Sequence, residues 1–169
     1  TVSNRSKTYV DKIINQISGE YFKNYNINKI ARNEYGAKIY YGEENEFFDY
    51  DKVVIASHAD EALKMIKDAT DDEKKILENF KYRENTAVIH FDESIMPKNK
   101  KAWCSWNSLL NQGNKEQSSV TYWLNQLQNL NISKNIFLTI NPFFRIEPNK
   151  IFNKINFTHP YYCLLYTSD

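Results

Sequence analysis

The first apolar residues of the chain recur every three or four positions, which is typical of one face of an α-helix. Ser6 is a suitable N-cap for such a helix, and Gly19 is a suitable residue to end it. We therefore predict a helix between these two residues. Its apolar stripe consists of Tyr9, Val10, Ile13, Ile14 and Ile17.

The pattern then changes to short segments with strand character. Segment 25–31 is the first, and segments 38–41 and 46–48 are joined by a turn around Gly42. In segment 52–56, three apolar residues follow one another and are bounded by polar residues. A continuous apolar run of this kind is typical of a strand buried on both faces.

Two helices are predicted after this run, because each has a residue pattern suited to a helix start. Ser57 followed by Asp60 resembles a capping box, in which the first side chain and the residue three positions later exchange hydrogen bonds with the backbone. Thr70 followed by Glu73 is a better example of the same pattern. Apolar residues at helical spacing follow both starts.

The second half of the chain is predicted to be a series of strands with proline- and glycine-containing connections. Consecutive strands of this kind suggest an antiparallel or mixed sheet. Together with the helices of the first half, they predict an α+β fold. The predicted strands are residues 85–91, 102–106, 118–127, 136–140 and 150–157.

The composition narrows the classes of function. The net charge is +1, and the basic and acidic residues are mixed along the chain. Nucleic-acid-binding proteins usually concentrate positive charge on one face, so no nucleic-acid partner is expected. No apolar run approaches the roughly 20 residues that cross a bilayer, and Cys104 and Cys163 belong to no CxxC pair. We therefore expect no transmembrane segment, no disulfide framework, no zinc site and a cytoplasmic location.

Motifs that bind phosphates or activate a nucleophile are absent. With four glycines in total, the chain has no GxGxxG, Walker-type or GxSxG motif. His58 follows the predicted buried strand, and junctions between a strand and a helix often face a ligand. His90 lies within a predicted strand and is interpreted as structural. No two histidines have the H-x-x-x-H spacing of a helical metal site, so no metal is expected.

Segments 103–107 and 121–125 are the most unusual stretches, because each places aromatic rings beside side-chain amides or hydroxyls. On pleated strands, alternate residues of these segments would point to opposite faces. One interpretation is a sheet that packs one face on the core. The other is the aromatic wall of a ligand cavity, with a few polar groups that orient the ligand.

Several motifs together resemble the predicted NAD/FAD-binding flavoproteins related to amine oxidases. The resemblance covers roughly residues 1–160 and lies in six short motifs that occur in the family's order. They are Thr1-Val2 with Ser6 and Tyr9-Val10, then residues 53–60, Trp106-Asn107, residues 121–128, Asn141-Pro142 and His159-Pro160.

The resemblance implies an α+β fragment of a two-domain, Rossmann-like FAD-binding fold of the amine-oxidase type. Residues 1–57 would be part of the FAD-binding domain. Residues 58–160 would be the substrate domain, with a helix pair and a mixed sheet. The family pattern ends before residues 161–169, which we interpret as a non-native tail.

The implied function is that of a partial FAD-dependent oxidoreductase, in which flavin accepts a hydride from an organic, small-molecule or lipid-like substrate. We expect the fragment to be inactive alone, and its catalytic residues are not predicted. The resemblance implies that FAD is contacted by Ile27, Ser57 and His58. It implies that the substrate pocket is formed by Trp106, Asn107, Tyr122, Trp123 and Asn125.

A second hypothesis comes from a different class of protein. A non-catalytic α+β module could use the same aromatic strands to hold a lipid or another apolar ligand. Such a module needs no cofactor. Titration of the chain with FAD and then with fatty acids distinguishes the two hypotheses, because lipid binding without any need for flanking sequence favours the module.

Overall fold

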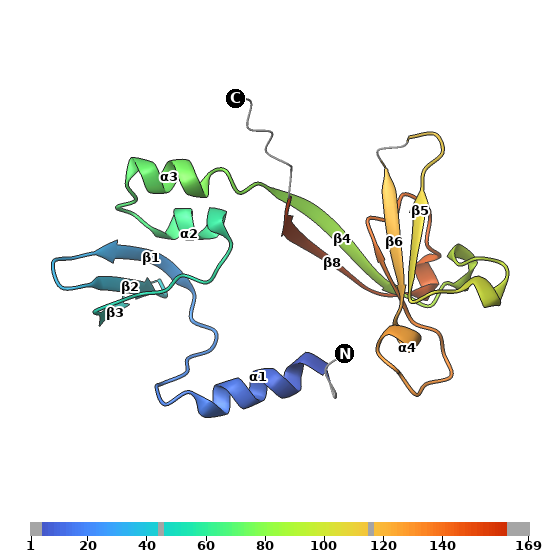
Figure 1. The fold of residues 1–169 in the computed structure, drawn as a ribbon, viewed down its shortest axis with the longest axis horizontal. Coiled ribbons are helices and arrows are strands. Elements are labelled where there is room, and N and C mark those ends of the chain that lie inside the picture. Colours follow the sequence, from blue (N-terminus) through green and yellow to red (C-terminus); the bar gives the residue numbers. More distant parts are fainter. Residues whose placement is uncertain (1–4, 44–45, 115–116, 162–169) are drawn as a thin grey trace, which may run out of the picture. The chain divides into compact units, whose positions relative to one another are not determined.

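The computed structural model describes residues 5–43, 46–114 and 117–161 (Figure 1). The chain divides into two compact units. Unit 1 comprises Thr1–Lys81 and Pro160–Asp169, and unit 2 comprises Tyr82–His159. This division places the helix pair with the first unit, whereas the sequence prediction placed its boundary at residue 57. The predicted tail lies outside the described residues except for Tyr161.

Unit 1 contains a small antiparallel sheet and three α-helices within its described part. Its elements are α1 (Arg5–Gln16), β1 (Ile27–Arg32), β2 (Ala37–Tyr41), β3 (Glu46–Tyr50), α2 (Ala59–Met65) and α3 (Asp71–Leu77). The strands pair in the order β1-β2-β3. An isolated parallel bridge joins Ile30 of β1 to Ile66, and the Lys67 N–H donates to the Ile30 carbonyl at 3.1 Å. The sheet is therefore connected to the end of α2.

The helix starts test the predicted caps. Thr70 and Glu73 form the predicted capping box, with the Thr70 hydroxyl accepting from the Glu73 N–H at 3.2 Å. The box predicted at Ser57 is wrong, because His58 occupies the N-cap position of α2 and makes no side-chain capping bond. Helix α1 begins at Arg5, so Ser6 lies inside the helix. Of the three predicted helix starts, only the capping box at Thr70 and Glu73 forms as predicted.

The apolar run in segment 52–56 is not the buried strand that its sequence predicts. Among the described residues it belongs to no sheet, and Val54 is 91% exposed. Val53 and Ile55 are half-buried. A run of this kind is buried on both faces only when other strands lie beside it. No described strand occupies those positions.

Gly36 allows the turn between β1 and β2 to approach the end of β3. A Cβ atom added there would lie 2.0 Å from the Tyr50 carbonyl oxygen and 2.8 Å from the Asp51 Cα. Both contacts are with backbone, so the strand itself would have to move. We expect Gly36→Ala to lower the free energy of unfolding of unit 1 by about 1–3 kcal/mol.

Hydrogen exchange of the amides of β2 and β3, measured by NMR, checks this expectation. The matched control is Gly113→Ala, because a Cβ at Gly113 meets only the Asn111 side chain at 3.5 Å. Protection of β2 and β3 that is unchanged in Gly36→Ala would contradict the expected close approach.

Unit 2 is built on a five-stranded sheet with the strand order β5-β6-β7-β4-β8. Its elements are β4 (Tyr82–His90), the 3-10 turns η1 (Glu93–Ile95) and η2 (Lys100–Ala102), β5 (Trp106–Leu110), β6 (Ser118–Trp123), α4 (Leu124–Leu127), β7 (Phe137–Ile140), η3 (Pro148–Lys150) and β8 (Ile151–Pro160). The pairs β5–β6, β6–β7 and β4–β7 are antiparallel. The α+β class is confirmed. The mixed sheet is corrected to an antiparallel one in the described residues.

Two predicted strands of unit 2 differ from the structure. The segment 102–106 was expected to be a strand, but β5 begins only at Trp106. Its earlier residues include Trp103, which caps the turn η2 and is buried. The segment 118–127 ends as a strand at Trp123 and continues as α4. The pleated alternation expected before Trp106 and after Trp123 is therefore absent.

The core of unit 2 is aromatic. Phe137 of β7 is fully buried, and the Trp103 ring contacts it edge-on with centroids 5.7 Å apart. Trp103 also contacts the Trp123 ring edge-on at 5.3 Å. Its indole N–H donates to the Pro97 carbonyl at 2.8 Å, so the buried ring has no unpaired donor. Met96 completes this cluster of buried residues.

Candidate functional site

The three residues predicted to contact FAD lie in unit 1. Ile27 is the first residue of β1, is half-buried and pairs with Tyr41. Ser57 is exposed, and its hydroxyl donates to the His58 carbonyl at 3.2 Å. His58 is half-buried at the start of α2. Ser57 and His58 are adjacent and directly follow the unpaired apolar run.

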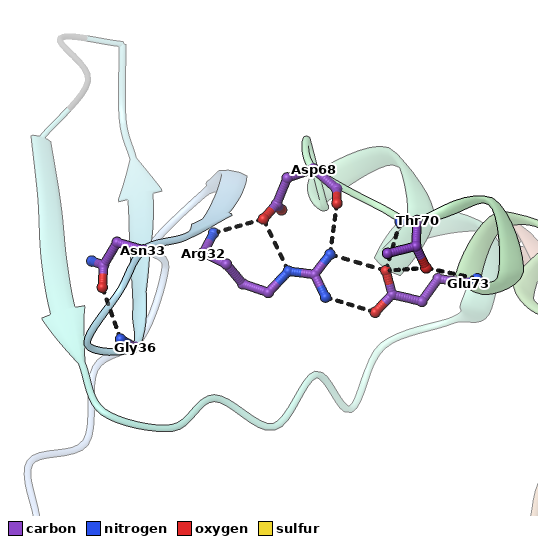
Figure 2. A network of polar contacts seen from close by, with 6 residues as sticks. All are labelled: Arg32, Asn33, Gly36, Asp68, Thr70 and Glu73. Atoms are coloured by element: carbon purple, nitrogen blue, oxygen red, sulfur yellow. Dashed lines mark hydrogen bonds and ion pairs between the residues drawn. The ribbon is translucent and has the colours of Figure 1, made fainter.

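The most extensive polar network near these residues centres on Arg32, the last residue of β1. Figure 2 shows its guanidinium between Asp68 and Glu73. Arg32 Nε donates to Asp68 Oδ2 at 2.9 Å, and the two terminal nitrogens donate to the Glu73 carboxylate at 2.8 and 2.9 Å. A further bond of 2.6 Å reaches the Asp68 carbonyl. The network ties the end of β1 to the first turn of α3.

The same contacts set the protonation of these side chains. The hydrogen bond from Arg32 and those from Thr70 lower the pKa of Glu73 to about 2. The hydrogen bond from Arg32 also lowers the pKa of Asp68, and both carboxylates raise the pKa of Arg32. The three side chains are 38–44% exposed, so solvent screens the network. Because the Arg32 guanidinium is already paired with two carboxylates, Arg32 is poorly suited to bind an anion.

A cavity of about 340 Å³ lies beside this network in unit 1. Asp68, Glu73 and Arg32 contribute charged side chains to its lining. The apolar part of the lining includes both half-buried residues of the unpaired run. These apolar residues are Ile30, Ala37, Val53, Ile55 and Ile66. The lining of the cavity is therefore partly charged and partly apolar, and the segment that lacks strand partners contributes to it.

The aromatic residues predicted for the substrate pocket lie in unit 2 and are only partly brought together. Trp106 and Tyr122 are cross-strand partners whose rings meet edge-on with centroids 5.3 Å apart. Trp106 is 65% exposed, so this pair lies on an open face of the sheet. Trp123 instead packs on Trp103, and its indole N–H donates to Asn135 at 3.0 Å.

The two predicted asparagines make backbone contacts. Asn107 donates to the Cys104 carbonyl at 2.6 Å and accepts from the Cys104 N–H at 3.2 Å. Asn125 accepts from the Ile136 N–H at 2.8 Å and donates to the Lys134 carbonyl at 2.9 Å. Both amides therefore hold loops beside the sheet, and neither lines the cavities of about 340 and 530 Å³ in the two units.

A buried polar chain crosses the sheet of unit 2. His90, Thr139 and Thr121 are each 0% exposed. His90 Nε2 lies 2.8 Å from the Thr139 hydroxyl, which lies 2.9 Å from the Thr121 hydroxyl. The Asp92 N–H donates to His90 Nδ1 at 3.1 Å. Because Nδ1 accepts, the neutral ring carries its proton on Nε2 and donates to Thr139.

Asp92 lies at the His90 end of this series of hydrogen-bonded side chains and is 2% exposed. Its carboxylate accepts from the Glu147 N–H at 3.1 Å, the Ser94 hydroxyl at 2.7 Å and the Lys150 ammonium at 3.3 Å. Burial acts to raise the pKa of Asp92, but these hydrogen bonds outweigh it and lower the pKa to about 2. Burial lowers the pKa of His90 to about 4, against the weaker opposing effect of the Asp92 charge.

The sequence pattern favours a structural role for His90, but the contacts of Asp92 are visible only in the structure. Its partners Glu147 and Lys150 are 55 and 58 positions away, and no local pattern connects them. Within the described ranges, no group of three or more His, Cys, Asp or Glu side chains is placed to hold a metal ion. None of the described helices has both the length and the apolar character needed to cross a bilayer.

The sequence matches no known protein-family model, and no curated protein matches it.

Proposed function

We propose that this chain is the central part of an FAD-dependent oxidoreductase of the amine-oxidase type, which passes a hydride from an organic substrate to flavin. The observation that carries the proposal is the unpaired apolar run at Val53, Val54 and Ile55. It follows a three-stranded antiparallel sheet and precedes helix α2. The run also lies within residues 53–60, one of the motifs that resemble the flavoprotein family.

The exposure of the run argues for missing strands beside it. Val54 is 91% exposed, whereas burial of a valine side chain contributes roughly 1.5–3 kcal/mol. Continuous apolar runs are typical of parallel sheets covered on both faces, and dinucleotide-binding domains are built on such sheets. A parallel sheet supplied by further polypeptide would bury Val54 and extend the run as a strand.

The residues present do not by themselves fit a flavin dinucleotide. Such a ligand places its pyrophosphate on a helix N-terminus behind a glycine-rich turn. The four glycines are Gly19, Gly36, Gly42 and Gly113, and no two are close enough in sequence to form that turn. Ile27, Ser57 and His58 could supply only peripheral contacts. We therefore infer that the main contacts with FAD come from polypeptide beyond this chain. No step of the reaction is assigned to these three residues.

The coding sequence upstream of this chain tests the proposal. We expect it to encode a strand–GxGxxG–helix unit with an acidic residue about 20 positions further on. The product that includes this unit should purify with the absorbance spectrum of bound flavin, whereas the 169-residue chain alone should not. Replacing the second motif glycine of the longer product by valine is the control, because a side chain there blocks the pyrophosphate.

Two results would contradict the proposal. One is an upstream sequence without such a unit. The other is a chain that purifies yellow by itself, since binding of FAD would then not depend on the missing phosphate site.

A further inference from the structure

A cavity of about 530 Å³ in unit 2 lies along strands β4 and β8. These strands are neighbours in the sheet, as Figure 1 shows. The volume falls within the roughly 300–1,000 Å³ typical of small-molecule sites. None of the five residues predicted for the substrate pocket lines it.

The charged groups of this cavity all have one sign. Arg83 of β4 and Lys154 of β8 contribute to the lining, and no described Asp or Glu does. Lys154 forms no ion pair with a described residue, whereas Lys150, four positions earlier in the sequence, is paired with Asp92 and Glu147. Two cations in a lining to which no described carboxylate contributes favour the binding of an anion.

The rest of the lining divides into a rigid polar part and an apolar part. Asn141 accepts from the Thr86 N–H at 2.8 Å and donates to Asn85 at 2.7 Å, so the polar part is held in place. The apolar part includes Val88 and Ile146, which are 3% and 6% exposed. It is completed by Phe144, Ile151 and Pro142. Hydrocarbon placed there would gain burial.

We propose that this cavity binds a small anionic amphiphile, with its carboxylate or phosphate at Lys154 and Arg83 and its hydrocarbon part against Phe144, Ile146 and Ile151. The shared chemistry is a single anionic head on a short apolar chain. The inference does not depend on FAD, because every residue involved lies in unit 2 and in the described part of this chain.

Isothermal titration calorimetry of the full chain with octanoate, octyl phosphate and octan-1-ol tests the proposal. At least one of the two anions should bind about tenfold or more tightly than the neutral alcohol, because a hydrogen bond to a charged group is worth more than one to a neutral group. The stronger of the two anions identifies a carboxylate or a phosphate as the preferred head. Equal binding of the alcohol and both anions, or no binding of either anion, would overturn the proposal.

Variants separate the cavity from general attraction to positive charge. Lys154→Met should weaken anion binding about tenfold, and Lys154→Arg should retain most of it. Lys98→Met removes the same charge from an exposed residue that does not line the cavity, so it should leave the affinity unchanged. Equal losses in Lys154→Met and Lys98→Met would overturn the assignment, and so would full affinity in Lys154→Met. Circular dichroism of each variant establishes that the fold is retained.

Discussion

Asp92→Ala is expected to lower the free energy of unfolding of unit 2 by about 2–4 kcal/mol, because removing the buried carboxylate leaves several part-buried donors without their acceptor. The carboxylate is 2% exposed and satisfies the Glu147 N–H, the Ser94 N–H and hydroxyl, and part of the Lys150 ammonium. Alanine satisfies none of them. A fully buried donor left without a partner costs about 1–3 kcal/mol, and these part-buried donors each cost less because water reaches some of them.

Tryptophan fluorescence during urea denaturation measures this loss in unit 2 alone. The chain has three tryptophans, and Trp103, Trp106 and Trp123 all lie within this unit. Glu84→Ala is the matched control, since Glu84 is an exposed acidic residue of the same unit. A loss below about 1 kcal/mol for Asp92→Ala, similar to that of the control, would show that these donors find other partners in the variant.

The features that sequence predicts correctly are those whose chemistry is local. The capping box at Thr70 and Glu73 forms within one helical turn. The turn at Gly42 has a φ of 67°, a conformation that glycine adopts without strain. The β2–β3 hairpin follows from the short apolar segments on either side of this turn. In each case the residues that decide the conformation are neighbours in the sequence.

Features that depend on distant partners escape prediction. Trp103 looks like a strand residue by alternation, yet it packs in the core against Phe137 and leaves β5 to begin at Trp106. The run at 53–55 has the composition of a buried strand, but its burial depends on neighbouring strands, which the composition of the run does not predict. The same limit applies to the candidate sites. The cations Arg83 and Lys154 meet only because β4 and β8 pair, so no motif could have joined them.

Lowering the pH from about 6.5 to about 4 is expected to reduce the free energy of unfolding of unit 2 by about 3 kcal/mol through His90 alone. Burial lowers the pKa of His90 to about 4 in the folded state from the ordinary value of 6.5. Between these values the unfolded chain binds a proton that the folded chain does not, so acid favours unfolding. The contribution is fully present above pH 6.5 and is lost as the pH approaches 4. Asp92, with its pKa lowered to about 2, acts only in a lower window between about 3.8 and 2.

The urea midpoint of tryptophan fluorescence, measured in steps between pH 7 and pH 4, checks this expectation. His90→Gln removes the titrating group while keeping an acceptor and a donor for the Asp92 N–H and the Thr139 hydroxyl. It should abolish most of the fall in stability over this range, even though it lowers stability at pH 7. His159→Gln removes another histidine of unit 2 and should leave the fall in place. If the His90→Gln protein lost as much stability between pH 6.5 and pH 4 as the parent, the buried ring would not be the group that takes up the proton.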